Sequence, residues 1–313
     1  MTLARWLTAA AEERGRGHQR NGQPCQDAVC VTTAGALPAC AVVCDGAGSA
    51  PRSDLGARAV SAAVHTLLQR SFSKIVVMDR EAAAMEVIGT ALTAIREAGA
   101  SQETLKEYAC TLHFVVTDGA AVIAGSIGDG LVIEQSVGGA LSVMFPPLRG
   151  EFANETVMVT SRYAEASVQL VRKNAGGCAG FALFTDGSGE SLYNRAAAAA
   201  APAVGSMLDW FDAAAPSVVQ DALRKNVHEF LASSTDDDCG IALLRRVEVT
   251  SLEASKGARI LELAGVTRSR DLQNRLAAMR YWSEFRDQGN PQGMSRQTYK
   301  RHVKWLQEHV ALL

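Results

Sequence analysis

The sequence predicts an α+β fold in which antiparallel sheets are covered by helices. Three observations predict it: short apolar segments alternate with turn residues, other segments show helical periodicity, and some consecutive apolar segments are joined by very short turns. The chain has 313 residues, of which 48% are hydrophobic, and a net charge of −2. A chain of this length and composition buries one large core or two smaller ones, which excludes a largely disordered protein.

Each predicted strand is a short apolar segment bounded by residues that favour turns. The segments span residues 28–33, 39–45, 109–118, 121–128, 131–136, 156–160, 178–185 and 239–245. Turns that contain Asp-Gly join two pairs of consecutive strands, at Thr117-Asp118-Gly119 and at Gly128-Asp129-Gly130. Such short turns predict antiparallel hairpins.

Helical periodicity predicts helices over residues 53–69, 80–98 and 216–231. In the first of them, one face is expected to carry Leu55, Ala59, Ala63 and Leu67. After Val247 the pattern is almost entirely helical, with helices predicted over residues 251–263, 271–286 and 296–309.

Charge is divided unevenly along the chain. Residues 1–244 hold 18 Lys and Arg against 26 Asp and Glu, a net charge of −8, whereas residues 245–313 hold 13 against 7, a net charge of +6. We therefore expect two parts, a domain over residues 1–246 and a basic helical module over residues 247–313.

The sequence predicts a cytoplasmic protein that does not contact a membrane. Its longest apolar runs are far shorter than the roughly 20 residues of a membrane span, and Glu12 and Glu13 interrupt the N-terminal segment before a secretory signal could form. The 7 cysteines lie in apolar segments and include no Cys-x-x-Cys pair. They are predicted to be buried free thiols rather than disulfides or zinc ligands.

Aspartates stand at the ends of several predicted strands, mostly beside Gly or another Asp. They are Asp27, Asp45, Asp129, Asp186 and the triplet Asp236-Asp237-Asp238. Each alone has a plain structural explanation as a turn residue, a helix cap or part of a solvated loop. Several carboxylates that met at one rim of a sheet would repel one another unless a hard cation neutralised them. The set therefore predicts a metal site, and oxygen ligands favour Mg²⁺ or Mn²⁺ over zinc.

These aspartates belong to motifs that occur in a fixed order. The motifs are Gln26-Asp27-Ala28, Asp45-Gly46-Ala47-Gly48, Gly128-Asp129-Gly130, Thr185-Asp186-Gly187 and Asp237-Asp238-Cys239-Gly240-Ile241. Over about residues 15–245, the chain resembles the type-2C (PPM) metal-dependent serine/threonine phosphatases, in particular their bacterial PphC-like branch. The resemblance implies a four-layer α-β-β-α sandwich of two antiparallel sheets, here with a C-terminal helical extension. It also implies two Mg²⁺ or Mn²⁺ ions at one end of the sandwich.

The resemblance also implies roles for individual residues. Asp45 would bridge the two ions, the Gly46 carbonyl would bind the second ion, and Asp186 and Asp237 would complete the first. Asp237 is chosen because the family's motif ahead of its last strand aligns with Asp237-Asp238-Cys239-Gly240, and a shift of one residue would select Asp236 or Asp238 instead.

Other residues would have supporting roles. Asp27 would hold metal-bound water, whereas Asp129 and Glu190 would serve a weaker third ion. The implied reaction is in-line attack of a metal-activated water on the phosphorus of phosphoserine or phosphothreonine, followed by protonation of the departing alkoxide.

The chain departs from the family pattern at two positions. Ala47 stands where many members carry the His proposed as general acid, which leaves a metal-bound water or His18 as the proton donor. Gly22 stands where many members carry a phosphate-binding Arg, and Arg20 is the nearest substitute. Further candidates for that role are Arg16 and Arg52. The PphC-like branch lacks both groups, so their absence does not argue for an inactive protein.

The expected substrate is a phosphorylated protein. The basic module is expected to dock on a protein partner, such as a kinase, or on the acidic domain of its own chain. DNA binding is disfavoured because a net charge of +6 is modest for a surface that tracks phosphates. Two alternatives stay open at this stage: a phosphatase-fold binding protein without activity, and a nucleic-acid-binding regulator that acts through the basic helices.

Overall fold

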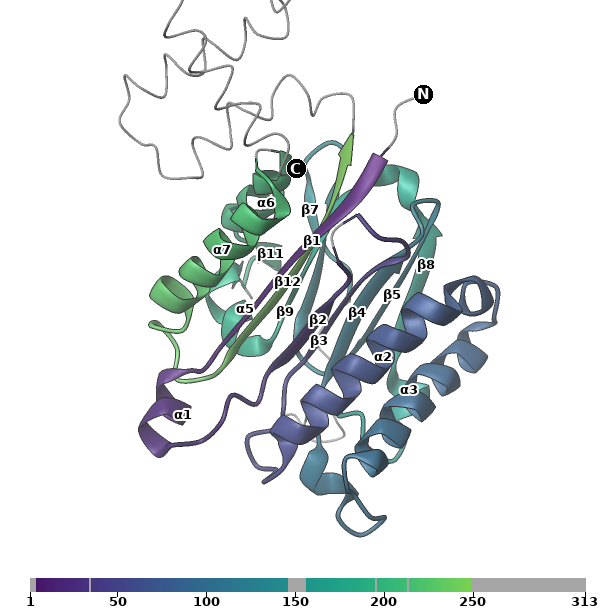
Figure 1. The fold of residues 1–313 in the computed structure, drawn as a ribbon, viewed down its shortest axis with the longest axis vertical. Helices are drawn as coiled ribbons and strands as arrows, with labels where there is room; N and C mark the ends of the chain where they lie inside the picture. Colours follow the sequence, from purple (N-terminus) through teal and green to yellow (C-terminus); the bar gives the residue numbers. More distant parts are fainter. Residues whose placement is uncertain (1–3, 34, 146–155, 195, 213, 249–313) are drawn as a thin grey trace, which may run out of the picture.

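Two antiparallel sheets form the centre of the protein in a computed structural model, which describes residues 4–33, 35–145, 156–194, 196–212 and 214–248 (Figure 1). The first sheet consists, in spatial order, of β1 (Ala4–Glu13), β12 (Cys239–Glu248), β9 (Cys178–Phe184), β6 (Leu131–Ser136) and β7 (Leu141–Val143). The second consists of β2 (Ala28–Val31), β3 (Ala39–Cys44), β4 (Leu112–Thr117), β5 (Ala121–Ile127) and β8 (Gln169–Asn174). A separate short pair joins β10 (Tyr193–Asn194) and β11 (Ala199–Ala200).

Helices cover the outer side of each sheet (Figure 1). Over the second sheet lie α2 (Ser53–Ile75) and α3 (Arg80–Glu97), and over the first lie α6 (Pro202–Asp209) and α7 (Pro216–Asn226). The shorter helices are α1 (Arg16–Asn21), α4 (Ala164–Ser167) and α5 (Asp186–Leu192). Single turns of 3₁₀ helix occur at Leu105–Tyr108, Ala175–Gly177 and Trp210–Asp212, and a π-helical turn at Val227–Leu231 follows α7. The predicted α-β-β-α sandwich is confirmed, whereas the helices predicted after residue 250 lie outside the described residues.

Three hydrophobic layers follow from the alternation of side chains along the strands. In β3, Ala39, Ala41 and Val43 face the first sheet, whereas the intervening residues face α2 and α3. The layer between the sheets also contains the stacked rings of Trp6 and Phe181, whose centroids are 5.9 Å apart. Strands buried on both faces explain the nearly continuous apolar segments of the sequence.

The buried face of α2 differs from the predicted one. It is formed by residues that include Ala57, Val60, Val64 and Leu68, whereas Leu55 is exposed. The helix approaches closely on the side of Gly56, where an added Cβ would lie 2.1 Å from the carbonyl oxygen of Tyr108. Because of this close approach, the face of α2 that carries Gly56 packs against the protein. The hydrophobicity of the side chains alone does not predict this orientation of the helix.

One of the two predicted hairpins is wrong. The turn at Thr117-Asp118-Gly119 joins β4 to its neighbour β5 as predicted, and Asp118 Oδ1 accepts hydrogen bonds from the N–H groups of Ala120 and Ala121, both at 2.9 Å. The Gly128-Asp129-Gly130 turn instead carries the chain from β5 in the second sheet to β6 in the first. Gly128 has a φ of 117°, which favours glycine. The crossing places Asp129 at the rim between the sheets.

Strand assignments also differ at several other segments. The predicted strand over residues 156–160 is wrong, because residues 159–163 contain turns and Met158 N–H donates to Ser161 Oγ at 2.9 Å. The apolar pattern of the sequence does not predict β1, β7 and β8, nor the short β10 and β11. β1 is rich in Ala, a weak strand former, and it forms through pairing with β12 from Ala4↔Glu248 to Glu13↔Cys239. β12 therefore continues two residues beyond the predicted boundary at residue 246.

No helix among the described residues is long and apolar enough to span a membrane. All 7 cysteines are free, as predicted. Cys25 and Cys30 are half-buried, and the others are buried.

Candidate metal centre

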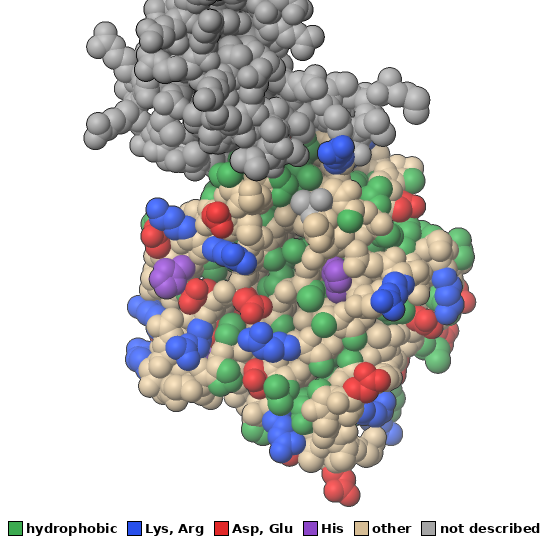
Figure 2. Space-filling view, in the orientation of Figure 1, with side chains coloured by type: hydrophobic (Ala, Val, Ile, Leu, Met, Phe, Trp, Pro, Cys, Tyr) green, Lys and Arg blue, Asp and Glu red, His purple; other side chains and the backbone are tan. Residues whose placement is uncertain are grey.

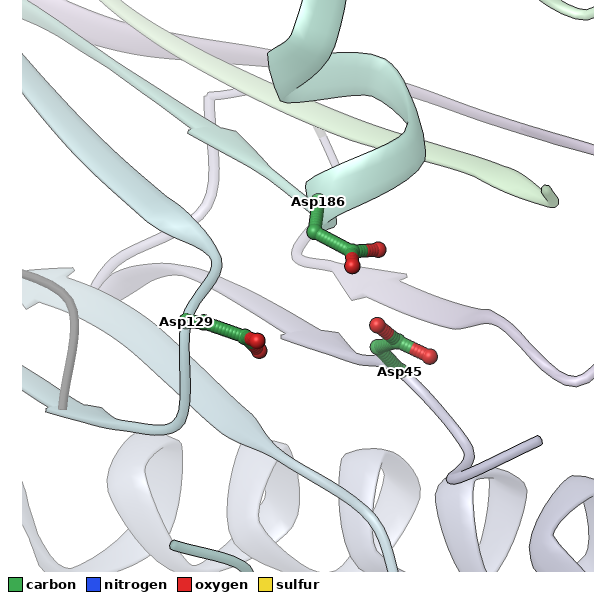
Figure 3. Close-up of side chains that lie close together, drawn as sticks. All are labelled: Asp45, Asp129 and Asp186. Carbon is green, nitrogen blue, oxygen red and sulfur yellow. The ribbon is translucent and has the colours of Figure 1, made fainter. Parts of the chain in front are cut away.

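Three aspartate side chains meet at the rim between the two sheets. Asp45 follows β3, Asp129 lies in the turn between β5 and β6, and Asp186 is the first residue of α5. One carboxylate oxygen from each lies within 4.8 Å of the others, and the side chains point toward a common space (Figure 3). All three are half-buried, so the space is open to solvent on one side. In the described part of the chain, no other group of three acidic, His or Cys side chains is as close.

Hydrogen bonds to neighbouring segments fix the backbone at Asp45. Its N–H donates to Thr111 Oγ1 at 2.9 Å, and its carbonyl accepts from the Thr111 N–H at 2.8 Å. The next N–H, that of Gly46, donates to the carbonyl of Gln26 at 3.1 Å. A Cβ on Gly46 would lie 2.8 Å from that carbonyl oxygen and 2.9 Å from Ser53, so only glycine fits.

The start of α5 places Asp186. Thr185 precedes it in an extended conformation, as the N-cap residue of the helix. Gly187 then allows close contact with the loop before β12, because a Cβ there would lie 2.2 Å from the carbonyl oxygen of Asp238 and 3.1 Å from the Cβ of Asp237. Asp237 is therefore a neighbour of the helix that carries Asp186.

The electrostatics of the group favour a bound cation. Desolvation, followed by the negative charges of Asp27 and Asp186, raises the pKa of the Asp45 carboxyl well above its usual value. The pKa of the Asp237 carboxyl is also raised, first by desolvation and then by Asp186. Carboxyl groups this close to one another do not readily ionise at the same time, because their negative charges repel. A divalent cation that binds between them neutralises the charges and so stabilises the ionised forms.

Asp27 lies behind the group of three. Its side chain is buried, and desolvation raises the pKa of its carboxyl, which a hydrogen bond from Thr185 opposes. Thr185 Oγ1 donates to Asp27 Oδ2 at 2.7 Å and accepts from the Gly240 N–H at 2.8 Å. Thr185 was not singled out in the sequence, although its place directly before Asp186 would have suggested it.

Asp238 has a structural role that the sequence analysis missed. Its buried carboxylate accepts from the N–H groups of Gly15 at 2.8 Å and Gln26 at 2.6 Å. The third contact is with His18 Nδ1, 2.8 Å from Oδ2. Asp237 differs, since its own Oδ1 accepts the N–H of Asp238 at 2.9 Å. Asp238 thus ties the N-terminal segment to the start of β12.

We expect Asp238→Asn to lower the free energy of unfolding by about 1–3 kcal/mol, because one of the buried groups loses its acceptor. Urea unfolding of the two proteins measures the difference. Asp236→Asn is the matched control, because Asp236 is exposed and pairs only with surface arginines, so its loss changes stability little. Equal unfolding midpoints for Asp238→Asn and the unchanged protein would contradict the role of Asp238.

The remaining predicted site residues lie outside the group of three. His18 lies on α1 and contacts Asp238 through its Nδ1. On the same helix, the exposed Arg20 pairs with Asp236 at 2.9 Å. Glu190 is exposed on α5. Arg52 contacts Glu107 at 3.6 Å and donates to the Tyr108 hydroxyl at 3.2 Å.

The residues around the group fit a hydrated Mg²⁺ or Mn²⁺ ion. The ligand atoms are carboxylate oxygens, which these ions prefer. Three residues that contact the glycines next to Asp45 and Asp129 each have a buried atom without a hydrogen-bond partner among the described residues: Gln26 Oε1, Ser53 Oγ and His113 Nε2. Buried polar atoms normally have partners, and the waters that accompany such an ion are suitable ones.

Comparison with known proteins identifies the family. Residues 14–232 match the family model described as Protein phosphatase 2C. The chain belongs to the protein phosphatase 2C family. The prediction that it is a phosphoprotein phosphatase is thereby confirmed.

Individual relatives of this 2C phosphatase agree with the assignment. Serine/threonine-protein phosphatase 3 of Escherichia coli (strain K12) is 28% identical over 250 residues, which cover 76% of this chain and 97% of the relative. The catalytic domain of PstP, solved in complex with 2 manganese ions, has a TM-score of 0.56 at 15% identity and covers 78% of this chain and 100% of that one. PppA, described as a key regulatory component of T6SS in Pseudomonas aeruginosa, has a TM-score of 0.55 at 15% identity and covers 79% and 100%. These solved structures confirm the fold of the 2C phosphatase.

Proposed function

We propose that the protein hydrolyses phosphoserine and phosphothreonine in phosphorylated proteins with the help of two Mg²⁺ or Mn²⁺ ions. The observation that carries this proposal is the convergence of Asp45, Asp129 and Asp186 at one rim. Membership of the 2C family and the manganese ions of the PstP complex support it. When bound, two such ions supply an activated attacking water and neutralise the charge of the phosphoryl group.

The protein residues would divide the work according to their positions. Asp45 would bridge the ions, because its carboxylate faces the space that it shares with both Asp129 and Asp186 (Figure 3), and the Gly46 carbonyl would bind the second ion. Asp186 would hold the first ion together with Asp237, which lies beside α5.

The supporting residues would act from the edge of the centre. Asp27, fixed by Thr185, would orient metal-bound water. Asp129 and Glu190 would hold a weaker third ion. The exposed Arg20 on α1 would bind the phosphate of the substrate. To do so it would leave its ion pair with Asp236.

His18 is proposed as the proton donor to the departing alkoxide. Asp238 fixes its Nδ1, the arrangement in which a carboxylate orients an imidazole so that the other nitrogen transfers the proton. We expect His18→Gln to lower kcat for a phosphothreonine peptide by about 10²-fold. Hydrolysis of 4-nitrophenyl phosphate is expected to change little, because 4-nitrophenolate leaves without protonation.

His228→Gln is the control for this comparison, since His228 is an exposed histidine that pairs with Glu13 at 3.3 Å. Equal losses on both substrates in His18→Gln would remove His18 from the proton-transfer step.

The proposed function is tested with the full chain and a phosphothreonine peptide. Turnover is expected with Mn²⁺ or Mg²⁺, and loss of turnover with a chelator, restored by excess metal. A truncation after Glu248 is expected to keep hydrolysis of small phosphoesters, because β12 ends there. Metal binding without turnover in either form of the protein would instead favour the binding-only alternative.

The partner predictions rest on charge alone. A kinase or another protein would dock on residues 247–313, a segment that lies mostly outside the described residues. On the face shown in Figure 2, Lys and Arg side chains are interspersed with Asp and Glu, so the described residues of that face form no continuous basic stripe. This mixture disfavours nucleic acid as a partner of the phosphatase domain. A cytoplasmic location stays a prediction.

A further inference from the structure

His113 is a buried histidine that the proposed reaction does not use. It lies on β4, opposite Val43 of β3 and Ser126 of β5, and its exposed fraction is 0%. Its neighbours along the strand, Leu112 and Phe114, belong to the hydrophobic layer under the helices. By alternation, His113 points between the two sheets.

One nitrogen of the His113 ring is held and the other is not. Nδ1 lies 2.9 Å from Ser126 Oγ, within hydrogen-bond distance. Nε2 is buried and has no partner among the described residues. Burial lowers the pKa of the ring to about 4, an effect that the charge of Asp129 opposes. The neutral ring still needs a hydrogen-bond partner at each nitrogen, because a buried polar atom rarely goes without one.

The unpartnered nitrogen faces the turn that carries Asp129. A Cβ on Gly130 would lie 2.5 Å from His113 Nε2, and a Cβ on Gly128 would lie 3.5 Å from it. The two glycines thus leave the space that the edge of the imidazole fills. Thr156 Oγ1 donates to Asp129 Oδ2 at 2.7 Å, which holds the carboxylate from another side. The turn is therefore held between Thr156 and His113.

We infer that His113 is a positioning residue of the metal centre, whose Nε2 holds a water of the ion bound beside Asp129. His113 does not join Asp45, Asp129 and Asp186 in the group whose ligand atoms lie within 4.8 Å, and its Nε2 lies instead against Gly128 and Gly130, on either side of Asp129. Mg²⁺ and Mn²⁺ sites of this kind keep several waters, and side chains that hold such waters tune the affinity of the site. The inference rests on the proposed metal-dependent function.

Two amide variants separate the nitrogens of the ring. Asn reproduces the position of Nδ1 and so keeps the contact with Ser126, whereas Gln reproduces the position of Nε2. We expect His113→Asn to weaken Mn²⁺ binding by about tenfold, the loss typical of residues behind the direct ligands. His113→Gln is expected to retain most of the affinity. Isothermal titration of the metal-free full chain with Mn²⁺ measures both.

The melting temperature of each metal-free variant gives a second readout. Both variants lose the ring, so a purely structural role would lower both melting temperatures and leave Mn²⁺ affinity unchanged in both. Thr117→Val is the control, because Thr117 is also buried on β4 but bonds to the turn at the other end of the strand. It is expected to lower stability without changing Mn²⁺ affinity.

Equal Mn²⁺ affinity in His113→Asn and His113→Gln would overturn the inference. Ser126→Ala keeps the ring but releases Nδ1, and it is expected to weaken Mn²⁺ binding less than His113→Asn does. Unchanged affinity in Ser126→Ala together with a failure of both His113 variants to fold would also overturn it. If the unchanged protein binds no Mn²⁺, the proposed function fails as well; if it binds and hydrolyses while the variants do not differ, only the inference fails.

Discussion

Asp45→Asn is expected to lower kcat/KM for a phosphothreonine peptide by about 10³-fold, because loss of several kcal/mol of metal-assisted stabilisation corresponds to a factor of this size. The Asn side chain keeps the shape of Asp45 but brings no charge to the group with Asp129 and Asp186. Mn²⁺ binding, measured by titration calorimetry, is expected to be lost together with activity.

Asp118→Asn is the matched control for this experiment. Asp118 also lies in a turn that contains Asp-Gly, but in the β4–β5 hairpin, where its Oδ1 only accepts backbone N–H groups. An Asn side chain provides the same acceptor, so activity and metal binding should be unchanged. Full activity in a folded Asp45→Asn protein would exclude Asp45 as a metal ligand.

Asp45→Asn is also expected to be more stable than the unchanged protein when both are metal-free. Desolvation and the charges of Asp27 and Asp186 raise the pKa of the Asp45 carboxyl from a usual value of 3.8. A proton on Asp45 therefore stabilises the fold; this contribution is complete below pH 3.8 and is lost as the pH rises through the raised pKa. Asn removes the penalty at neutral pH.

Thermal unfolding from about pH 4 to pH 8 in the presence of a chelator measures this effect. The melting temperature of Asp45→Asn minus that of the unchanged protein should grow with pH and reach a few degrees, since about 1 kcal/mol shifts the midpoint of a domain of this size by about 2–4 °C. Added Mn²⁺ should reverse the order by stabilising only the unchanged protein. A difference in melting temperature that does not vary with pH would show that ionisation of Asp45 does not destabilise the metal-free fold.

The ordered motifs, through the resemblance that they carry, were enough to predict the sandwich, and the aspartates at strand ends predicted that several carboxylates meet at one rim. Which three of them lie within 4.8 Å of one another was not predicted, because Asp129 was expected to serve only a weaker third ion. Continuous apolar segments bounded by turn residues also located most strands, because strands such as β3 are buried on both faces. β1 was not predicted, because its Ala-rich sequence forms a strand only through its pairing with β12. The crossing at Gly128-Asp129-Gly130 escaped prediction because a short turn within one sheet and a short passage between two sheets have the same local sequence.

The division of labour within Asp236-Asp237-Asp238 could not be predicted from local sequence either. The three residues are chemically identical, and their roles depend on contacts with segments far away in the chain, such as that of Gly15 with Asp238 and that of Gly187 with Asp237. His113 is a similar case. A single His in an apolar strand indicates burial, but only the fold brings it against the turn of Asp129.

The direction of β12 limits how residues 249–313 can influence hydrolysis. The strand starts at Cys239, next to the loop that carries Asp237, and ends at its tenth residue, Glu248. A strand of that length spans about 33 Å. A tethered segment that acts on the metal centre must first cover this distance, and its effective concentration there depends on the length and stiffness of the linker. Shortening the chain directly after Glu248 would therefore change such an effect without altering any residue of the metal centre.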